Sequence, residues 1–415
     1  MVKQKIFAII FFLVPAVSFC QQKNLRYFTD TAIKINPALY ANKNLTLSNS
    51  IDSQIIVAAN KIQVNGVSNS YYAPVVNGIG YDAAITNGQQ LAAMVAITKQ
   101  IYNKKNLAVQ YENLRLQSDS LKIASAITTQ DIKKAVTTQY ILTYGDQLQI
   151  NFTNELIRLL SNEETILKTL TQKNVYKQSD YLSFLVTLQQ QQLTRSQLIV
   201  QYKNDYATLN YLSGITDTST AIPLSDPGLQ YINGFEMDTS VFLRKFVNDS
   251  LQLRNLRTGV AVSYRPKVSL SADGGYLSSL VLKPYKNFGT NFGINLTIPI
   301  YDGHQRKLQY AKIDLMEQTR EKERDYFGQQ LDQQIAQLQQ QLRELENLKG
   351  PIDKQIEYLK TLIGVNGKLL ETGDIRITDY ILALNNYITS QNLVVQNLVA
   401  RYEVINQLNY WTSNY

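Results

Sequence analysis

Apolar and polar residues alternate along two parts of the chain. From Phe288 to Ile300, Phe, Ile and Leu occupy nearly every second position, and Asn, Gly and Thr fill most of the positions between them. Shorter alternations lie over 79–85 and 90–98, on either side of Thr86-Asn87-Gly88, which favours a tight turn. A period of two residues is typical of a strand whose two faces have different surroundings. We predict two β-hairpins on this basis, over about 72–101 and about 264–301.

Long stretches without proline follow each predicted hairpin. One extends from about Lys104 to Gln172, and a continuous helix of that length would be roughly 100 Å long. A similar stretch begins near His304, with one predicted break at Gly350-Pro351. Leu and Ile recur in it with 4-3 spacing, which is typical of a coiled-coil seam. The seam positions are Leu331, Ile335, Leu338, Leu342 and Leu345, followed by Ile352, Ile356, Leu359 and Ile363.

Each long helix is expected to end at a short turn and to be followed by a return helix. Asn174 and Gly373 are residue types that readily take the left-handed conformation that ends a helix. Ser179 and Thr378 are candidate N-caps of the two return helices. A further helix, over about 37–62, precedes the first hairpin and carries an apolar stripe. The predicted helical hairpins cover about 104–212 and about 304–412.

The chain repeats itself at a constant offset of 199 positions. Ile101-Tyr102-Asn103 returns as Ile300-Tyr301-Asp302, and Asp180-Tyr181 returns as Asp379-Tyr380. An offset held over more than a hundred residues indicates two copies of one structural unit. We predict a first repeat over 21–212, a linker or outer belt over 213–238, and a second repeat over 239–415.

The connection between the two strands is expected to differ between the repeats. Tyr72-Ala73-Pro74 and Tyr264-Arg265-Pro266 are separated by 192 positions instead of 199. If both triplets precede the first strand of their hairpin, the second connection is seven residues longer, over roughly 280–286. Variation in length is typical of an exposed loop.

The N-terminus has the features of a secretory signal peptide. Lys3 and Lys5 precede an apolar run over 6–14, and Ser18 and Cys20 place small residues before a cleavage site. We expect residues 1–20 to be removed; the alternative is a lipoprotein signal in which Cys20 is lipidated. Cys20 is the only cysteine, so cleavage would leave a mature chain without disulfides.

Charge and composition argue against several classes of function. The formal net charge is +8, and loss of Lys3 and Lys5 with the leader leaves +6. Basic clusters with interleaved aromatic residues are not found, so no nucleic-acid partner is expected. His304 is the only histidine, which suits a capping or surface role better than a zinc site. The chain has no GxxxxGK[ST] loop either. We predict no catalytic residue, no cofactor and no metal site.

The two-faced strands have two possible settings. An apolar face opposite a face of Asn, Gly and Thr is what a strand shows between lipid and a water-filled lumen. A half-buried antiparallel sheet in a soluble domain has the same alternation. The pattern by itself leaves both settings open.

At this point the chain resembles the TolC-like outer-membrane channels, the family of outer membrane efflux proteins, over nearly all of its mature length. The most specific match is the segment from Phe292 to Gly303, an apolar alternation that ends in Pro-Ile-Tyr-Asp-Gly. It is similar to the family's strand-to-helix junction, which usually ends in Pro-Leu-Phe-Asp-Gly-Gly. Gly373, Asp379 and Ala383 also keep the family's spacing at the helical tips. The first repeat has Asn174 in place of that glycine.

The resemblance implies a mainly α fold with a membrane β part. Long antiparallel coiled-coil helices would form an α-barrel tunnel, and four strands per protomer would contribute to a trimeric 12-stranded β-barrel. The implied function is passive export through the outer membrane and periplasm of a Gram-negative cell, in a tripartite efflux or type I secretion-like system. The implied partners are two further copies of the chain, a periplasmic adaptor (membrane fusion) protein, an inner-membrane transporter and outer-membrane lipid.

Three other classes of protein remain as alternatives. A periplasmic adaptor also contains a helical hairpin, and a coiled-coil structural protein or adhesin would have long helices without a pore. An exported enzyme is the third, although no constellation of residues supports catalysis.

The turns between the long helices are the candidate site. In a trimer, three copies of Asp379 would surround one periplasmic aperture, and such a ring favours cations. Arg376 and Asp374 lie on the same turn and could form pairs that hold the aperture closed. Asp180 and Lys177 are the equivalent residues of the first repeat; the alternative role for these acids is to stabilise a helix start. The residues expected to form the tip turns and to dock the adaptor are Gly373, Asn174, Thr378, Ser179, Tyr380 and Tyr181.

Overall fold

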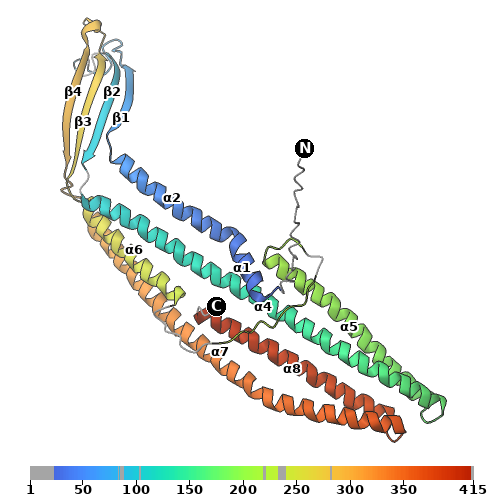
Figure 1. Ribbon diagram of the computed structural model, residues 1–415. Helices are drawn as coiled ribbons and strands as arrows, with labels where there is room; N and C mark the ends of the chain where they lie inside the picture. Colours follow the sequence, from blue (N-terminus) through green and yellow to red (C-terminus); the bar gives the residue numbers. More distant parts are fainter. Residues whose placement is uncertain are drawn as a thin grey trace, which may run out of the picture. The chain divides into compact units, whose positions relative to one another are not determined.

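A computed structural model describes residues 23–412, apart from 83, 85–87, 102–103, 218–220, 232–239 and 281–282. The predicted leader over 1–20, with Cys20, lies outside the described residues. Helices and strands follow in the order α1 (Leu25–Ile35), α2 (Pro37–Ala59), β1 (Gln63–Tyr72), β2 (Gln89–Ile101), α4 (Lys104–Gln172), α5 (Gln178–Leu212), α6 (Val241–Ser263), β3 (Lys267–Ser278), the 3-10 helix η2 (Pro284–Lys286), β4 (Phe288–Thr297), α7 (Gln305–Thr372) and α8 (Ile377–Thr412) (Figure 1).

The chain forms two compact units, and neither is continuous in sequence. Unit 1 comprises the residues up to Lys34 together with 135–230 and 343–406. Unit 2 comprises 35–134, 231–342 and the residues from Gln407 onward, and it contains all four strands. Each unit takes segments from both predicted repeats. The division of the chain into those repeats stays a prediction.

The four strands of unit 2 form one antiparallel sheet in the order β1-β2-β3-β4 (Figure 1). The first hairpin pairs Gln63 with Thr98, and the second pairs Lys267 with Thr297. Strands β2 and β3 join the two hairpins, with Met94 opposite Gly275. Within the described residues, β1 and β4 are therefore the edges of the sheet.

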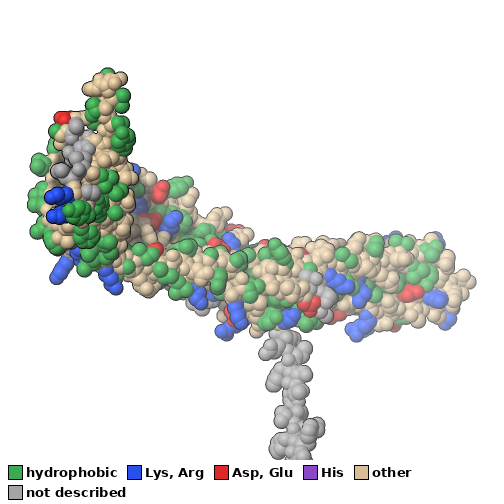
Figure 2. All heavy atoms as spheres, turned by 90° about the horizontal axis from the view of Figure 1, so that it is seen from above, with side chains coloured by type: hydrophobic (Ala, Val, Ile, Leu, Met, Phe, Trp, Pro, Cys, Tyr) green, Lys and Arg blue, Asp and Glu red, His purple; other side chains and the backbone are tan. Residues whose placement is uncertain are grey.

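The two faces of the sheet differ in polarity. Residues paired across neighbouring strands lie on the same face, and successive residues of a strand alternate between faces. One face carries mostly apolar residues, including Val95, Ile97, Leu270, Phe292 and Ile294; the other carries Asn65, Asn69, Thr98, Asn291, Asn295 and Thr297. Phe292 is 79% exposed and Ile294 is 75% exposed, so no described part of the chain covers this face around them. Figure 2 shows hydrophobic side chains gathered over the sheet.

The prediction that the alternation over 79–85 forms the first strand of the first hairpin is wrong. The strand is β1, over 63–72, and residue 79 belongs to an isolated bridge with Val76 in the connection that follows. Asn77 and Gly78 have φ values of 52° and 81°, so the chain turns sharply there. The alternation of apolar and polar residues over 79–85 resembles a strand, but its described residues lie in the connection between β1 and β2. β1 itself was missed because its apolar residues Val64, Val67, Tyr71 and Tyr72 do not recur at every second position.

The predicted difference in connection length is also wrong in sign. Gln63 and its partner Thr98 are 35 positions apart, whereas Lys267 and its partner Thr297 are 30 apart, so the first hairpin is the longer one. The two Tyr-x-Pro triplets are not equivalent, because Tyr72 ends β1 while Tyr264 precedes β3. The predicted turn residues Thr86 and Asn87 lie outside the described residues.

The long helices are confirmed. Helix α4 has the predicted ends, and α7 begins directly after His304. The predicted break at Gly350-Pro351 is wrong, because α7 continues through Pro351. Proline normally clashes with the Cβ of the residue before it, but Gly350 has none. The carbonyl of Asn347, four residues before the proline, belongs to an exposed residue and can be hydrated.

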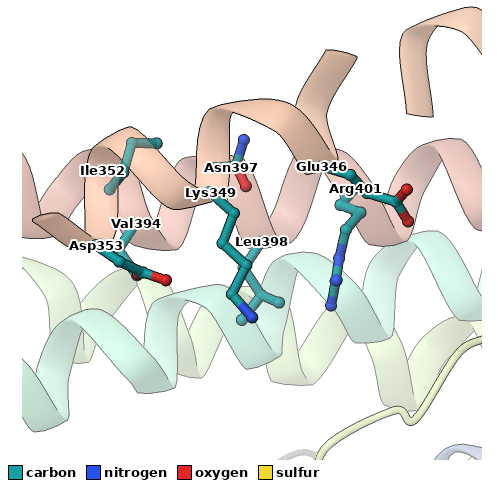
Figure 3. A pocket seen from close by; sticks show the side chains of 8 residues that line it. All are labelled: Glu346, Lys349, Ile352, Asp353, Val394, Asn397, Leu398 and Arg401. Atoms are coloured by element: carbon teal, nitrogen blue, oxygen red, sulfur yellow. The ribbon is translucent and has the colours of Figure 1, made fainter. Parts of the chain in front are cut away.

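The seam of α7 is buried as predicted, with one polar interruption. Leu338 and Leu342 are buried before it, and Ile356 and Ile363 after it. Lys349 takes the seam position between Leu345 and Ile352. A cavity of about 230 Å³ opens there between α7 and α8 (Figure 3). Its lining residues are Glu346, Lys349, Ile352, Asp353, Val394, Asn397, Leu398 and Arg401.

Helix α1 was not predicted, and Asn36 separates it from α2. The Asn36 side-chain oxygen accepts hydrogen bonds from the backbone N–H groups of Ala38 (2.9 Å) and Leu39 (3.3 Å), which caps α2. Helix α2 begins at Pro37 as expected and ends at Ala59. Its apolar stripe is exposed in the single chain, including Ile51, Ile55 and Val57.

Most of the described part of the predicted linker is fixed to unit 1. Leu224 is buried, its N–H donates to Gln147 Oε1 (2.6 Å), and its carbonyl accepts from Gln147 Nε2 (3.0 Å). The Tyr140 hydroxyl donates to the carbonyl of Ser225 (2.7 Å). A segment without helix or strand is thus held by side chains of α4.

Replacing Gly275 by Ala is expected to weaken the pairing between β2 and β3. An added Cβ would lie 2.6 Å from the Cα of Met94 and would overlap the carbonyl oxygen of Ala93, backbone atoms that can move only if the strands separate. We expect the free energy of unfolding to fall by about 1–3 kcal/mol, measured by urea denaturation followed by circular dichroism. Gly289→Ala is the control, because its Cβ would meet open space. Equal losses in the two variants would contradict this account.

Candidate functional site

The turn between α4 and α5 lies against the turn between α7 and α8 in unit 1. The Tyr176 hydroxyl shares its single hydrogen between the carbonyl oxygens of Leu370 (3.0 Å) and Ile375 (3.0 Å). Ile375 is the counterpart of Tyr176 in the other repeat, 199 positions later. A Cβ on Gly373 would lie 2.6 Å from the Val175 side chain, so the missing side chain allows the turns to approach. The two predicted tips are therefore one structural site.

Both outgoing helices end in the same way. Asn174 and Gly373 have φ values of 57° and 82°, which confirms the predicted left-handed conformation. The N–H of Val175 donates to the carbonyl of Leu170 (3.0 Å), five residues earlier. Asp374 makes the equivalent bond (2.9 Å) in the second repeat. These are Schellman motifs, which satisfy carbonyls that the helix leaves unpaired.

Ser179 and Thr378 are not N-caps, contrary to prediction. Helix α5 begins at Gln178 and α8 at Ile377, so both residues lie inside the first turn. No side chain caps α5; the Ser179 hydroxyl donates to the carboxylate of Asp180 instead (3.3 Å). Both helices start two residues earlier than predicted, and Lys177, which has extended backbone geometry, takes the N-cap position of α5.

The acids of the two turns differ in their partners. Asp379 accepts two hydrogen bonds from one guanidinium, Arg376 Nε at 3.0 Å and Nη2 at 3.1 Å. The Arg376 side chain is 82% exposed, so water screens the pair. Among the described ion pairs, Arg376 bonds Asp379 and not Asp374, and Lys177 does not bond Asp180. Asp180 and Asp379 lie in the first turns of their helices, where negative charge is favourable.

The repeated tyrosines of the two turns have different surroundings. Tyr380 is fully buried, and its ring stacks on Phe184 with the centroids 6.4 Å apart. Burial raises the pKa of its hydroxyl, and the nearby Glu163 carboxylate adds to the rise. Tyr181 is half-buried and donates to the carboxylate of Glu164 at 3.4 Å. The two turns share a backbone plan, but only Tyr380 belongs to the core.

A buried core supports the paired turns. Leu and Ile residues of the four helix segments pack around Phe184 and Tyr380. The buried members of this cluster are Leu156, Leu160, Leu167, Phe184, Leu188, Ile363, Leu370, Ile377, Tyr380, Ala383 and Leu384. Burial raises the pKa of the Glu163 carboxyl beside the cluster, and the charge of Glu371 raises it further.

Two features of unit 1 were missed from the sequence. Tyr176 carries no signal in the sequence, because its hydrogen bonds depend on a second turn far away in the chain. Asp146 of α4 faces Asp205 of α5, and burial together with that carboxylate raises its pKa to about 7. The one available signal was that Asp146 is the only acid between Asp131 and Glu155.

The remaining features of the described residues add no chemical site. They contain no group of three His, Cys, Asp or Glu side chains arranged to hold a metal ion. The cavity at Lys349 has two acids and two bases in its lining, and it lies where the helical seam is interrupted. We assign that cavity to helix packing.

None of the described helices has both the length and the apolar character needed to cross a membrane.

Replacing Tyr176 by Phe is expected to loosen the two turns. The ring is kept while both hydrogen bonds to the carbonyls of Leu370 and Ile375 are lost, at a cost of about 1–3 kcal/mol. We expect faster hydrogen–deuterium exchange in peptides covering 170–180 and 369–380. Tyr181→Phe is the matched control, because its single hydrogen bond is long. Unchanged exchange in the Tyr176 variant would contradict a role for this hydroxyl.

The Asp146–Asp205 pair predicts a pH dependence of stability. The folded protein binds the Asp146 proton more tightly than the unfolded chain, so stability falls as pH rises from about 4 to the raised pKa of about 7. Asp146→Asn should remove this slope and raise the midpoint of thermal unfolding at pH 8 by roughly 2 °C or more. Asp332→Asn, which changes an exposed acid, should keep the slope. Parallel pH profiles for the parent and Asp146→Asn would refute the assignment.

The arrangement of the chain is similar to several solved membrane proteins. The outer membrane protein VceC of Vibrio cholerae has a TM-score of 0.74 and 11% identity, over 94% of this chain and 95% of that one. A membrane protein from Pseudomonas aeruginosa gives 0.73 and 13%, over 94% and 90%. The CmeC outer membrane channel of Campylobacter jejuni gives 0.70 and 12%, over 94% and 85%. No protein-family model and no curated protein matches the sequence.

Identity at this level shows a shared fold and nothing finer. The long helices and the four-stranded sheet expected from the sequence are confirmed by this likeness. The chain has the fold of the TolC-like outer-membrane channels.

Proposed function

We propose that this protein is a passive export duct of the outer membrane that extends into the periplasm of a Gram-negative cell. Three copies form one channel. Its periplasmic end opens when an adaptor protein and an inner-membrane transporter dock there, as in a tripartite efflux or type I secretion-like system. The energy for transport comes from the transporter, since the chain has no nucleotide-binding loop.

One observation carries the proposal: the sheet has an uncovered apolar face opposite a polar one. Phe292, Ile294 and Leu296 are all at least 60% exposed in the single chain. An exposed apolar surface of this kind needs lipid or another protein to cover it. The opposite face carries Asn and Thr, which suit a water-filled lumen.

The open edges of the sheet support assembly of several copies. Strand backbones in hydrocarbon must have all their N–H and C=O groups paired, which only a closed sheet achieves. The four strands of the described chain leave β1 and β4 as edges. Pairing β4 of one copy with β1 of the next would close a barrel of twelve strands from three copies. The exposed stripe on α2 would then be available to pack against a neighbouring copy.

The paired turns supply the proposed aperture. In the trimer, three copies of Asp379 approach one axis, each held by its own Arg376. Asp374, Asp180 and Lys177 add charges to the same rim. The adaptor would dock on the turn surfaces formed by Gly373, Asn174, Thr378 and Ser179, with Tyr380 and Tyr181 beneath them.

The alternatives account less well for the sheet. A coiled-coil spacer or adhesin does not require strands with an exposed apolar face. A periplasmic adaptor would also have to cover that face with protein. The exposed Phe292 and Ile294 therefore favour the duct.

The assembly predicts a defined behaviour on purification. The mature protein should require detergent and should migrate as a trimer before heating and as a monomer after heating. Reconstituted in planar bilayers, it should conduct ions. A monodisperse single subunit that is water-soluble without detergent would refute the duct.

The aperture predicts a charge effect on gating. Replacing Arg376 by Gln and Asp379 by Asn together should raise the open probability in planar bilayers by up to about fivefold, the change expected for the loss of up to ~1 kcal/mol from an exposed ion pair. Lys177→Gln with Asp180→Asn is the matched control, because that pair forms no ion pair within the described chain. An open probability equal to that of the parent in the Arg376/Asp379 variant would contradict a role of this pair in closure.

A further inference from the structure

The four strand-to-helix junctions lie together where the strands begin or end. We call this end of the sheet its edge, as distinct from the edge strands β1 and β4. Gln63 pairs with Thr98, Ile101 with Val268, and Lys267 with Thr297. The start of β1, the end of β2, the start of β3 and the end of β4 are therefore neighbours. Helices α2 and α6 end at this edge, and α4 and α7 begin there.

Basic residues gather at this edge. Five exposed bases lie outside the strands, and together we call them the basic collar: Lys61, Lys104, Lys105, Arg306 and Lys307. Lys267 pairs with Thr297 and lies on the polar face, so it is not part of the collar. Asp302 is the only acid in the segments 60–63, 97–107, 264–268 and 298–308. Its carboxylate accepts the backbone N–H groups of His304 (3.0 Å) and Arg306 (2.8 Å), so it caps the start of α7. Within the described residues, no ion pair involves Lys61, Lys104 or Lys307.

The positions of these bases oppose the stability of the helices. Helix α4 begins with Lys104 and Lys105, and Arg306 and Lys307 lie in the first turn of α7. Neither helix has an acid in its first turn. The N-terminal end of a helix carries partial positive charge and favours acidic residues there. Asp302 already caps α7, so an anion from outside the chain would compensate the bases and the start of α4.

The collar also marks the end of the apolar face. Lys99 lies on that face, opposite Leu270, and its ammonium donates to the carbonyl of Asn60 at the sheet edge. A lysine placed in this way keeps its aliphatic stem on apolar surface while its charge reaches the polar boundary. Ile97 and Ile294 beside it continue the apolar surface away from the edge.

We propose that the basic collar binds the phosphates of anionic phospholipid headgroups in the periplasmic leaflet of the outer membrane. The proposal rests on the proposed function, since it takes the apolar face to be covered by lipid. The charges are spread along an edge next to apolar surface, an arrangement that suits a layer of headgroups better than a single bound anion. Juxtamembrane bases attract anionic lipid surfaces in the same way in other membrane proteins.

Vesicle binding at controlled salt tests the proposal. Detergent-solubilised protein is mixed with vesicles of phosphatidylcholine, or of phosphatidylcholine with about 30% phosphatidylglycerol, and the bound fraction is measured by flotation. We expect at least about tenfold preference for the anionic vesicles at low salt, and its loss at about 0.5 M NaCl, where charges are screened within a few ångströms. Equal binding to both kinds of vesicle would overturn the proposal.

Neutralising the collar is the decisive variant. Lys104→Gln, Lys105→Gln, Arg306→Gln and Lys307→Gln together should abolish the preference while leaving insertion into phosphatidylcholine unchanged. Lys283→Gln with Lys286→Gln, at the opposite edge of the sheet, is the control that should keep it. Thermal unfolding checks the fold of the fourfold variant, whose helices should be no less stable because the removed charges oppose their dipoles. A preference that survives the fourfold change would overturn the proposal.

Two further measurements distinguish lipid binding from binding of free phosphate, and failure of the collar proposal from failure of the duct proposal. Sodium phosphate at matched ionic strength should reduce binding no more than NaCl does; a larger effect would assign the collar to free phosphate and overturn the lipid proposal. Channel conductance is recorded for each variant. Loss of the lipid preference with conductance intact supports the collar, whereas a parent protein that binds anionic vesicles but never conducts would count against the duct alone.

Discussion

Backbone hydrogen bonding in the sheet is the constraint on which the rest of this structure depends. Four antiparallel strands pair with one another and leave β1 and β4 as edges in the described chain. The same sheet exposes Phe292 and Ile294 on one face. A sheet of this kind is complete only when its edges are paired and its apolar face is covered. The proposed trimer meets both requirements, and it also fixes where the helices that continue each strand must run.

The two turns between the long helices share their backbone geometry but differ in their side chains. Both outgoing helices end in Schellman motifs built on Asn174 and Gly373, so the two turns share one backbone plan. The side chains have diverged: Tyr380 lies in the core, whereas its counterpart Tyr181 is half-buried. Tyr176 joins the two turns by bonding backbone of the other repeat. The proposed aperture therefore has two unequal halves, of which only the second holds its acid in an ion pair.

At two places, charged side chains lie beside charges of the same sign or beside the positive end of a helix, and this lowers the stability of the fold. Asp146 lies against Asp205 in unit 1, and bases stand at the starts of α4 and α7 in unit 2. Neither arrangement is what helix stability alone would select. Folding tolerates the first because the carboxyl pair can keep a proton. The second is tolerated because the collar residues are exposed, where water screens their charges.

The sequence by itself determined the long helices, their left-handed ends and the second hairpin. These features follow from the spacing of neighbouring residues, which acts within one element: the 4-3 seam of α7, the positive φ of Gly373 and the alternation in β4. Sequence reasoning failed at β1, where few apolar residues mark the strand, and at Pro351, where the preceding Gly350 lets the helix continue. Only the tertiary structure decided the pairing of β2 with β3, the bonds of Tyr176 and the contact of Asp146 with Asp205. Each of these joins residues far apart in the chain, and local periodicity carries no information about which distant backbone or side chain will lie opposite.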